Sequence, residues 1–196
     1  MSRQKGDIMR DVLISLKPYY YYLIGENIKK VEVRKSYPKA EDWSRNSWFY
    51  MSRDEKSFAK IPKEFQEKYR KHFGKVGMRF VCDRIYDITP TSPHKYDCGW
   101  NVYEEHSRLT FDEFRNYLRE KNGYGWHITD LVVYDEPREL SEFKHECNGE
   151  CERTRNGKRC NHLEIDGIGC DCLIPITKAP QSWQFCVATE PRQTED

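Results

Sequence analysis

One short stretch of the sequence places charges of both signs at the spacing of a β-strand. Lys30, Glu32 and Arg34 are every second residue, so a strand would present them on one face, with Lys29 at its edge. A cation beside a carboxylate favours its ionised form. Arg offers a planar fork to a phosphate or a base edge, and Glu accepts from an exocyclic amine such as that of cytosine. This chemistry suits a nucleotide; the alternative is a solvated strand face with cross-strand ion pairs.

Residues elsewhere in the chain could line the same cleft. Ser15 and Lys17 alternate on an earlier strand and could add a phosphate contact. Gln181, Ser182 and Trp183 begin the last strand that we expect, and their polar side chains could either line the cleft or cap the neighbouring backbone.

Trp126 and His127 follow a glycine-rich turn and are further candidate ligand-binding residues. The indole offers a stacking face to a base, as in proteins that bind single strands. The imidazole could hydrogen-bond a ligand or act as an acid or base. In the alternative interpretation one of the two belongs to the core and the other is a satisfied surface residue.

An enzymatic interpretation of the same strand needs a nucleophile or an activated water beside a base. Lys29 and Glu32 could supply the base and the group that orients it, so they are the catalytic candidates if the protein is an enzyme. The sequence contains no Ser-His-Asp set, phosphate-cradling glycine loop or metalloprotease motif.

A second candidate site is rich in cysteine. Five of the eight cysteines fall within 26 residues, with His145 and His162 nearby: Cys147, Cys151, Cys160, Cys170 and Cys172. Zinc prefers four soft ligands in a tetrahedron, often as two close pairs. We expect a structural zinc ion, because four thiolates leave no open position for a substrate and the polar segment has little apolar content of its own. The alternatives are a reduced loop or disulfides.

These residues need elements to position them. Alternation predicts strands over residues 12–17, 29–34, 47–51, 76–88, 126–134 and 182–188. Helices are expected over residues 19–25 and 62–73 and from Thr110, where Thr110 and Glu113 form a capping box. Phe111, Phe114 and Leu118 would form the buried stripe of this last helix. Residues 89–107 are expected to be a long loop. This pattern predicts an α+β domain on a curled, mostly antiparallel sheet.

The composition of the chain excludes some classes of protein and predicts the kind of core. The chain has 33 basic and 32 acidic residues, so any contact with RNA must come from a local patch. Aromatic residues make up 14% of the chain, which predicts a core rich in rings rather than in Leu and Val. No apolar run approaches a membrane span, and the N-terminus lacks the apolar stretch of a signal peptide. We expect a cytoplasmic protein with no membrane partner and reduced thiols.

The order of motifs resembles a known family. Residues 12–18, followed by residues 27–34, resemble the opening of ASCH domains, relatives of the PUA RNA-binding domain. The family motif is Gly-x-Lys-x-x-Glu-x-Arg; Lys29, Glu32 and Arg34 match it, and Asn27 stands in place of the Gly. Asn tolerates positive φ well. Residues 123–128 and 179–183 resemble the later signatures of a bacterial and phage branch.

The resemblance implies a fold and a range of activities. It implies a PUA-like curled β-barrel with flanking helices over residues 1–143 and 174–196, interrupted by the Cys-rich insertion over residues 144–173. It also implies a cleft for RNA or a modified nucleoside. Some relatives are ribonucleases, and others are amidohydrolases that act on N4-acetylcytidine with a Lys, a Thr and a Glu. Glu32 stands at the position of that Thr, which counts against simple transfer of the amidohydrolase activity.

Three functions are therefore compared. We expect a module that binds RNA or a modified nucleotide, with Lys29, Glu32 and Arg34 as recognition groups. A hydrolase acting on a nucleoside or RNA is the first alternative, and a protein-interaction module that uses the zinc appendix is the second. The base preference and the oligomeric state stay open at this stage.

Overall fold

The computed structural model describes residues 10–39, 43–92, 95–97, 102–146 and 173–188. The strands are β1 (Arg10–Leu16), β2 (Val31–Arg34), β3 (Trp43–Met51), β4 (Val76–Val81), β5 (Ile85–Ser92), β6 (Lys95–Asp97), β7 (Gly123–His127), β8 (Thr129–Arg138), β9 (Lys144–Glu146), β10 (Leu173–Pro175) and β11 (Trp183–Cys186). The α-helices are α1 (Pro18–Gly25), α2 (Glu55–Phe58), α3 (Lys63–Arg70) and α4 (Phe111–Leu118). A π-helix (Val102–Ser107) and a 3-10 helix (Leu140–Glu142) complete the described elements.

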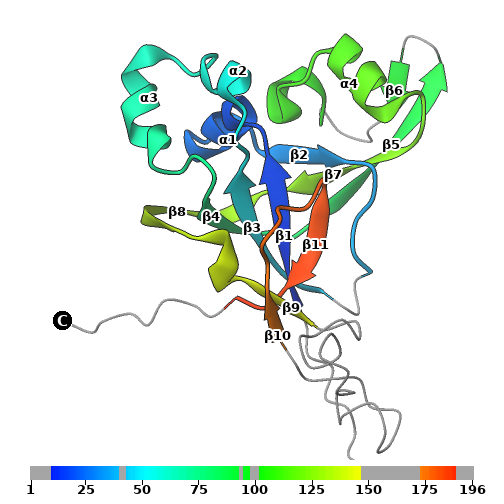
Figure 1. The fold of residues 1–196 in the computed structure, drawn as a ribbon. Coiled ribbons are helices and arrows are strands. Elements are labelled where there is room, and N and C mark those ends of the chain that lie inside the picture. Colours follow the sequence, from blue (N-terminus) through cyan, green and yellow to red (C-terminus); the bar gives the residue numbers. More distant parts are fainter. Residues whose placement is uncertain (1–9, 40–42, 93–94, 98–101, 147–172, 189–196) are drawn as a thin grey trace, which may run out of the picture.

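The described strands form three sheets (Figure 1). A five-stranded sheet has the order β11-β1-β3-β4-β8, a four-stranded sheet has the order β2-β7-β5-β6, and β9 pairs with β10. All pairings are antiparallel except β1 with β3. The expected α+β class and mostly antiparallel sheet are confirmed. The pairings among the described strands do not close a barrel.

Strand β1 lies inside the five-stranded sheet and is buried on both faces. Val12 and Ile14 belong to the main core. Leu13, on the opposite face of the strand, is also fully buried, in a second cluster with Trp48 and Phe143. The sequence correctly predicted the strand but not the layer that covers its second face.

Aromatic rings fill much of the core, as the composition predicted. Fully buried side chains include Trp43, Trp48, Trp126, Tyr21 and Tyr69. The rings of Trp43 and Trp126 are 4.9 Å apart between centroids. Because β3 and β7 belong to different sheets, this contact joins the two larger sheets.

Helix α4 begins where the capping box predicted. The Thr110 side chain accepts from the backbone amide of Glu113, and the Glu113 carboxylate accepts from the Thr110 amide. Phe114 and Leu118 are buried, while Phe111 is half-buried at the margin of the same cluster. The helix therefore packs on the apolar face of β2, where Val31 and Val33 join that cluster.

Several predicted boundaries were wrong. The expected strand over residues 76–88 is two strands, β4 and β5, which belong to different sheets. The strand expected over residues 126–134 is likewise divided between β7 and β8. The expected loop over residues 89–107 contains the end of β5, β6 and the π-helix. A continuous run of β-forming residues does not reveal where a chain crosses from one sheet to the next.

The ends of the Cys-rich segment lie side by side. Leu173 pairs with Glu146, and Ile174 pairs with His145, so β9 and β10 form a two-stranded stem. A backbone bridge between Lys144 and Val187 joins this stem to the end of β11. Among the described residues, no helix is long and apolar enough to cross a membrane.

Candidate functional site

Three of the four charged residues predicted here are buried rather than solvated, whereas Lys30 is exposed. Lys29, Glu32 and Arg34 are 2%, 7% and 5% exposed. The polar face turns towards α1 and β1, while Val31 and Val33 pack beneath α4. The alternative of a solvated strand face is therefore wrong, because other elements cover both sides of this strand.

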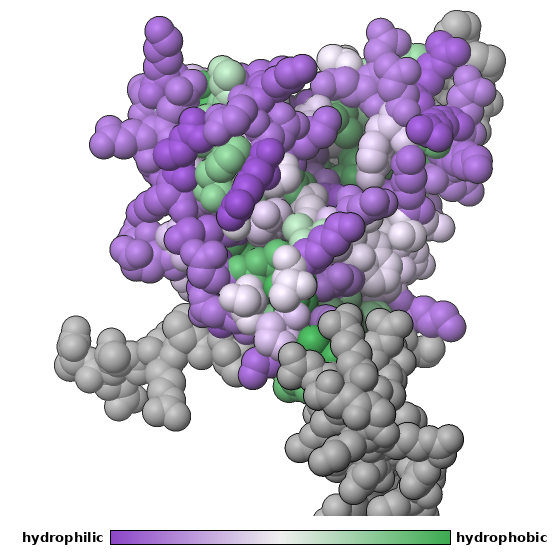
Figure 2. Space-filling model, viewed as in Figure 1, coloured by the Kyte–Doolittle hydropathy of each residue, from purple (hydrophilic) through white to green (hydrophobic). Residues whose placement is uncertain are grey.

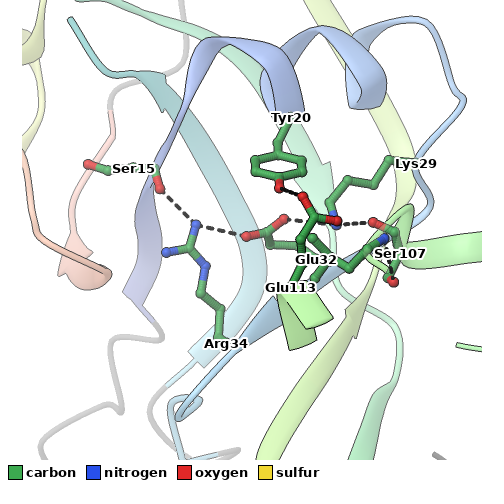
Figure 3. A network of polar contacts seen from close by, with 8 residues as sticks. Ser15, Tyr20, Lys29, Glu32, Arg34, Ser107 and Glu113 are labelled. Carbon is green, nitrogen blue, oxygen red and sulfur yellow. Dashed lines mark hydrogen bonds and ion pairs between the residues drawn. The ribbon is translucent and has the colours of Figure 1, made fainter. Parts of the chain in front are cut away.

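The three side chains form a single network around the Glu32 carboxylate (Figure 3). Arg34 Nη2 lies 3.0 Å from Glu32 Oε1, and Lys29 Nζ lies 3.5 Å from Glu32 Oε2. Lys29 Nζ also donates to the carbonyl oxygen of Ser107 at 2.6 Å. The carboxylate is thus held from both sides by cations that are themselves anchored.

Arg34 ties β2 to the five-stranded sheet. Its Nη2 donates to the Ser15 carbonyl at 2.7 Å, and its Nη1 donates to the Ser182 carbonyl at 3.3 Å. Ser15 and Ser182, both predicted from the sequence, therefore meet the network through backbone oxygens. Asn27, at the position of the motif glycine, has a φ of 58°, which is the conformation that this position requires.

Three residues that the sequence did not single out complete the site. Tyr20 of α1 donates its hydroxyl hydrogen to Glu113 Oε1 at 2.9 Å, and its ring lies 5.6 Å from Lys29 Nζ. Tyr117 of α4 has its hydroxyl next to the Arg34 guanidinium. Glu113 was interpreted only as a helix cap. Its position opposite α1 depends on tertiary packing, which a local motif does not encode.

Burial shifts the titration of several of these groups. Desolvation lowers the pKa of Lys29 below its usual range, and the Glu32 carboxylate offsets part of that shift. Desolvation raises the pKa of Tyr20, and its hydrogen bond to Glu113 raises it further. Burial also raises the pKa of the Tyr117 hydroxyl, although the Arg34 charge opposes the rise. Both tyrosines are therefore neutral hydrogen-bonding groups at neutral pH.

Trp126 and His127 were candidate ligand-binding residues, but neither belongs to the network around Glu32. Trp126 is opposite Glu32 in the β2–β7 register but is 0% exposed, so its indole presents no free stacking face. His127 is opposite Val31, on the other face of the ribbon. Its Nδ1 lies 2.6 Å from Asp83 Oδ1. The alternative interpretation, one core residue and one satisfied surface residue, describes this pair.

The remaining predicted residues lie at different depths. Lys17 and Gln181 are exposed. Trp183 is half-buried, and its Nε1 donates to Ser36 Oγ at 3.1 Å. Lys17 lies between β1 and α1, two residues from Ser15, and Gln181 is the chain neighbour of Ser182.

The molecular surface is hollowed above β2. Figure 2 shows a hollow between the side that carries α2 and α3 and the side that carries α4. Two exposed lysines lie close to residues of the network: Lys35 Nζ lies 5.1 Å from the Tyr117 ring, and Lys60 interacts electrostatically with Glu113. An anionic ligand that enters here would meet positive charge first.

The buried part of the network carries an excess of positive charge. Two cations, Lys29 and Arg34, contact one carboxylate, Glu32, whose side chain is 10% exposed. Removing charges from water is unfavourable, so such a network needs close geometry and additional hydrogen bonds. The carbonyls of Ser107, Ser15 and Ser182 provide those bonds.

Metal-binding residues were predicted only in the Cys-rich segment. Cys147, Cys151, Cys160, Cys170 and Cys172 lie outside the described residues. Within the described residues, no group of three or more His, Cys, Asp or Glu side chains could hold a metal ion. Among the described residues, Cys82 and Cys186 are buried free thiols. Burial raises the pKa of Cys82 to about 12.

No protein-family model and no curated protein matches this chain. Its structure is similar to crystal structures of ASCH from Zymomonas mobilis. The ASCH protein without a mutation gives a TM-score of 0.45 at 15% sequence identity, and the match covers 90% of this chain and 87% of that chain. Two mutant forms each give 0.46 at 15% and 14% identity, covering 90% of this chain and 89% and 88% of theirs.

Proposed function

We propose that this protein binds single-stranded RNA or a modified nucleotide in the hollow above β2. One observation carries the proposal: the Glu32 carboxylate is fixed between Lys29 and Arg34, with 10% of its side chain exposed. A fixed carboxylate only accepts hydrogen bonds, so it favours a ligand that presents N–H groups. The exocyclic amines of cytosine, adenine and guanine meet this requirement, whereas uracil has no exocyclic amine and offers only its ring N3–H.

The surroundings of Glu32 supply the other contacts that a nucleotide needs. Tyr20 and Tyr117 come from opposite sides of the network, and aromatic rings of this kind stack on any base. Lys35, next to Tyr117, and Lys60, near Glu113, would attract phosphate. A binding role needs no group to change its protonation state, which agrees with neutral tyrosines.

We further propose that residues 1–143 and 174–196 form a PUA-like domain of the ASCH type. The support is the order of motifs along the chain, with Lys29, Glu32 and Arg34 converging on one point. A crystal structure with a soaked nucleotide would test both the fold family and the location of the ligand.

Binding is tested by titrating fluorescently labelled single-stranded RNA at several salt concentrations. We expect affinity to fall as salt rises, because phosphate contacts release counterions. Lys35→Ala and Lys60→Ala should each weaken binding and reduce the salt slope by about one. Lys71→Ala is the matched control, because Lys71 pairs with Asp135 on β8 and should leave binding unchanged.

Glu32→Gln tests the recognition group itself. The amide keeps the shape of the side chain but can donate as well as accept, so affinity for bases with an amino group should fall at least about tenfold. Circular dichroism would confirm that the variant is folded. If RNA and nucleotides do not bind the wild type, or if Glu32→Gln binds them equally well, the proposal is wrong.

A hydrolase is the second candidate, and the lowered pKa of Lys29 favours it. A buried lysine with a lowered pKa can act as a general base, with Glu32 as the group that orients it. Turnover of N4-acetylcytidine or RNA that is lost in Lys29→Ala would support this function. Tight binding without any turnover would support the binding function and contradict the hydrolase.

We also propose that the Cys-rich insertion, residues 144–173, binds a structural zinc ion. The cysteine spacing is the main support. The β9–β10 pairing adds to it, because Glu146 and Leu173 are chain neighbours of Cys147 and Cys172. Metal analysis of protein purified from the cytoplasm without chelator should find about one zinc per chain. A metal-free preparation would contradict the proposal.

A further inference from the structure

Four partly exposed aromatic side chains lie beside the Glu32 site, where edge strand β11 of the five-stranded sheet meets β7 and the chain that follows β2. They are Tyr37, Tyr124, Trp183 and Phe185, here called the aromatic strip. Tyr37 is 42% exposed, an unusual position for a large ring in a chain with this much buried aromatic surface. The strip is built from three separate segments: the chain after β2, strand β7 and strand β11.

Ring contacts and one hydrogen bond join the members of the strip. Tyr37 and Tyr124 have ring centroids 4.6 Å apart, and Trp183 and Phe185 have centroids 5.7 Å apart. Trp183 Nε1 donates to Ser36 Oγ, which places Trp183 beside the residue that precedes Tyr37. Trp183 and Phe185 are two apart on β11, so they lie on one face of that strand.

The aromatic strip adjoins the Glu32 site directly. Arg34 donates to the carbonyl of Ser182, the residue before Trp183. Tyr124 is the register partner of Arg34 in the β2–β7 pair. A strand with one base at Glu32 therefore has aromatic surface beside it for its next bases.

Cations lie at both ends of the aromatic strip. The Arg10 guanidinium lies 3.9 Å from the centroid of the Phe185 ring. Lys35 and Lys39 are exposed on either side of Tyr37 in the chain. Rings that alternate with cations are the arrangement that binds single strands without strict sequence preference, because bases stack and phosphates pair with the cations.

We infer that the ligand of the Glu32 site is a single-stranded RNA of several nucleotides rather than a free nucleotide, and that its neighbouring bases stack on the aromatic strip. This inference rests on the proposed function, since one base must occupy the Glu32 site. It adds that affinity grows with the length of the strand, because each base on the strip contributes its own stacking contact.

Length-dependent binding tests the inference. The probes are the four nucleoside monophosphates and RNA homo-oligonucleotides of two, four and six residues, titrated by calorimetry. We expect the wild type to bind the longer oligonucleotides more tightly than the monophosphates. Tyr37→Ala should lower oligonucleotide affinity about tenfold and leave monophosphate affinity unchanged. Because Tyr37 is exposed, this variant is expected to fold normally.

Two further variants separate the possible outcomes. Trp183→Phe keeps a ring but loses the bond to Ser36, so it should weaken oligonucleotide binding less than Tyr37→Ala does. Val132→Ala is the control, because Val132 is 37% exposed on β8 at the opposite edge of the same sheet. Glu32→Gln should weaken monophosphates and oligonucleotides alike.

Equal affinity for monophosphates and oligonucleotides would overturn the inference and leave the proposed function intact. Length dependence that survives Tyr37→Ala and Trp183→Phe would also overturn it, because the longer strand would then lie elsewhere. If no probe binds, or if Glu32→Gln changes nothing, the proposed function fails as well.

Discussion

The Glu32 network and the His127–Asp83 contact lie close together on the β2–β7 ribbon and differ mainly in their access to water. Glu32 contacts Lys29 and Arg34 with side chains that are 10%, 1% and 6% exposed. On the opposite face, His127 contacts Asp83, with side chains that are 25% and 47% exposed. The exposed pair is the closer of the two, at 2.6 Å between Nδ1 and Oδ1.

We infer from this difference that burial, rather than distance, decides how strongly each contact is coupled to the fold. Water screens the His127–Asp83 pair, so it contributes little to stability. The Glu32 network has lost most of its water, so each of its members depends on the others for compensation. Such a network is also fixed in position before a ligand arrives, which suits recognition.

Glu32→Gln should have the largest effect on stability. It leaves the Lys29 and Arg34 charges buried without a carboxylate between them, so we expect the free energy of unfolding to fall by about 3–5 kcal/mol. Urea denaturation followed by circular dichroism measures this change. A loss below about 1 kcal/mol would mean that water reaches the network and that the comparison is wrong.

His72 tests the effect of burial separately, because it is a buried titratable side chain outside the network. It is 1% exposed, lies 3.0 Å from the Tyr21 hydroxyl, and burial lowers its pKa from 6.5 to about 4. The unfolded chain therefore binds more protons between these two values, and stability should fall by up to about 3 kcal/mol as the pH drops from 6.5 to 4. Urea midpoints of the wild type and His72→Gln across this range test it: the difference between them should shrink with acidification.

Thr110→Ala should have an intermediate effect on the element that covers the apolar face of β2. The change removes the hydroxyl that caps α4, so we expect a loss of about 1 kcal/mol. The loss should be the same at pH 7 and at pH 5, since no titrating group is removed, which makes this variant a control for His72→Gln. Thermal unfolding measures it, and an unchanged midpoint would contradict a stabilising cap.

Asp83→Asn should have the smallest effect, because its pair with His127 is exposed. We expect a change in stability of no more than about 1 kcal/mol at low salt, decreasing as salt screens the pair. A double-mutant cycle with His127→Gln, measured at two salt concentrations, isolates the pairwise energy. A coupling as large as that of Glu32 would show that distance, rather than burial, sets the strength of these pairs.

Local features of the structure could be predicted from the sequence. The capping box fixed the start of α4 at Thr110, because both of its hydrogen bonds form within one turn. The alternation of Val31 and Val33 with Glu32 and Arg34 predicted β2, because side chains alternate along any strand. The aromatic content predicted that rings would occupy much of the core, because each ring buries a large apolar area.

Tertiary structure alone decided what the two faces of β2 meet. Alternation does not say whether a polar face is solvated, so the burial of Lys29, Glu32 and Arg34 emerged only when α1, β1 and the π-helix were in place. The same packing buries Trp126 in the core and places Tyr20 within hydrogen-bonding distance of Glu113, which is 93 residues away in the sequence. A sequence determines the chemistry that its residues can perform, whereas long-range packing determines which of them lose their water and face one another.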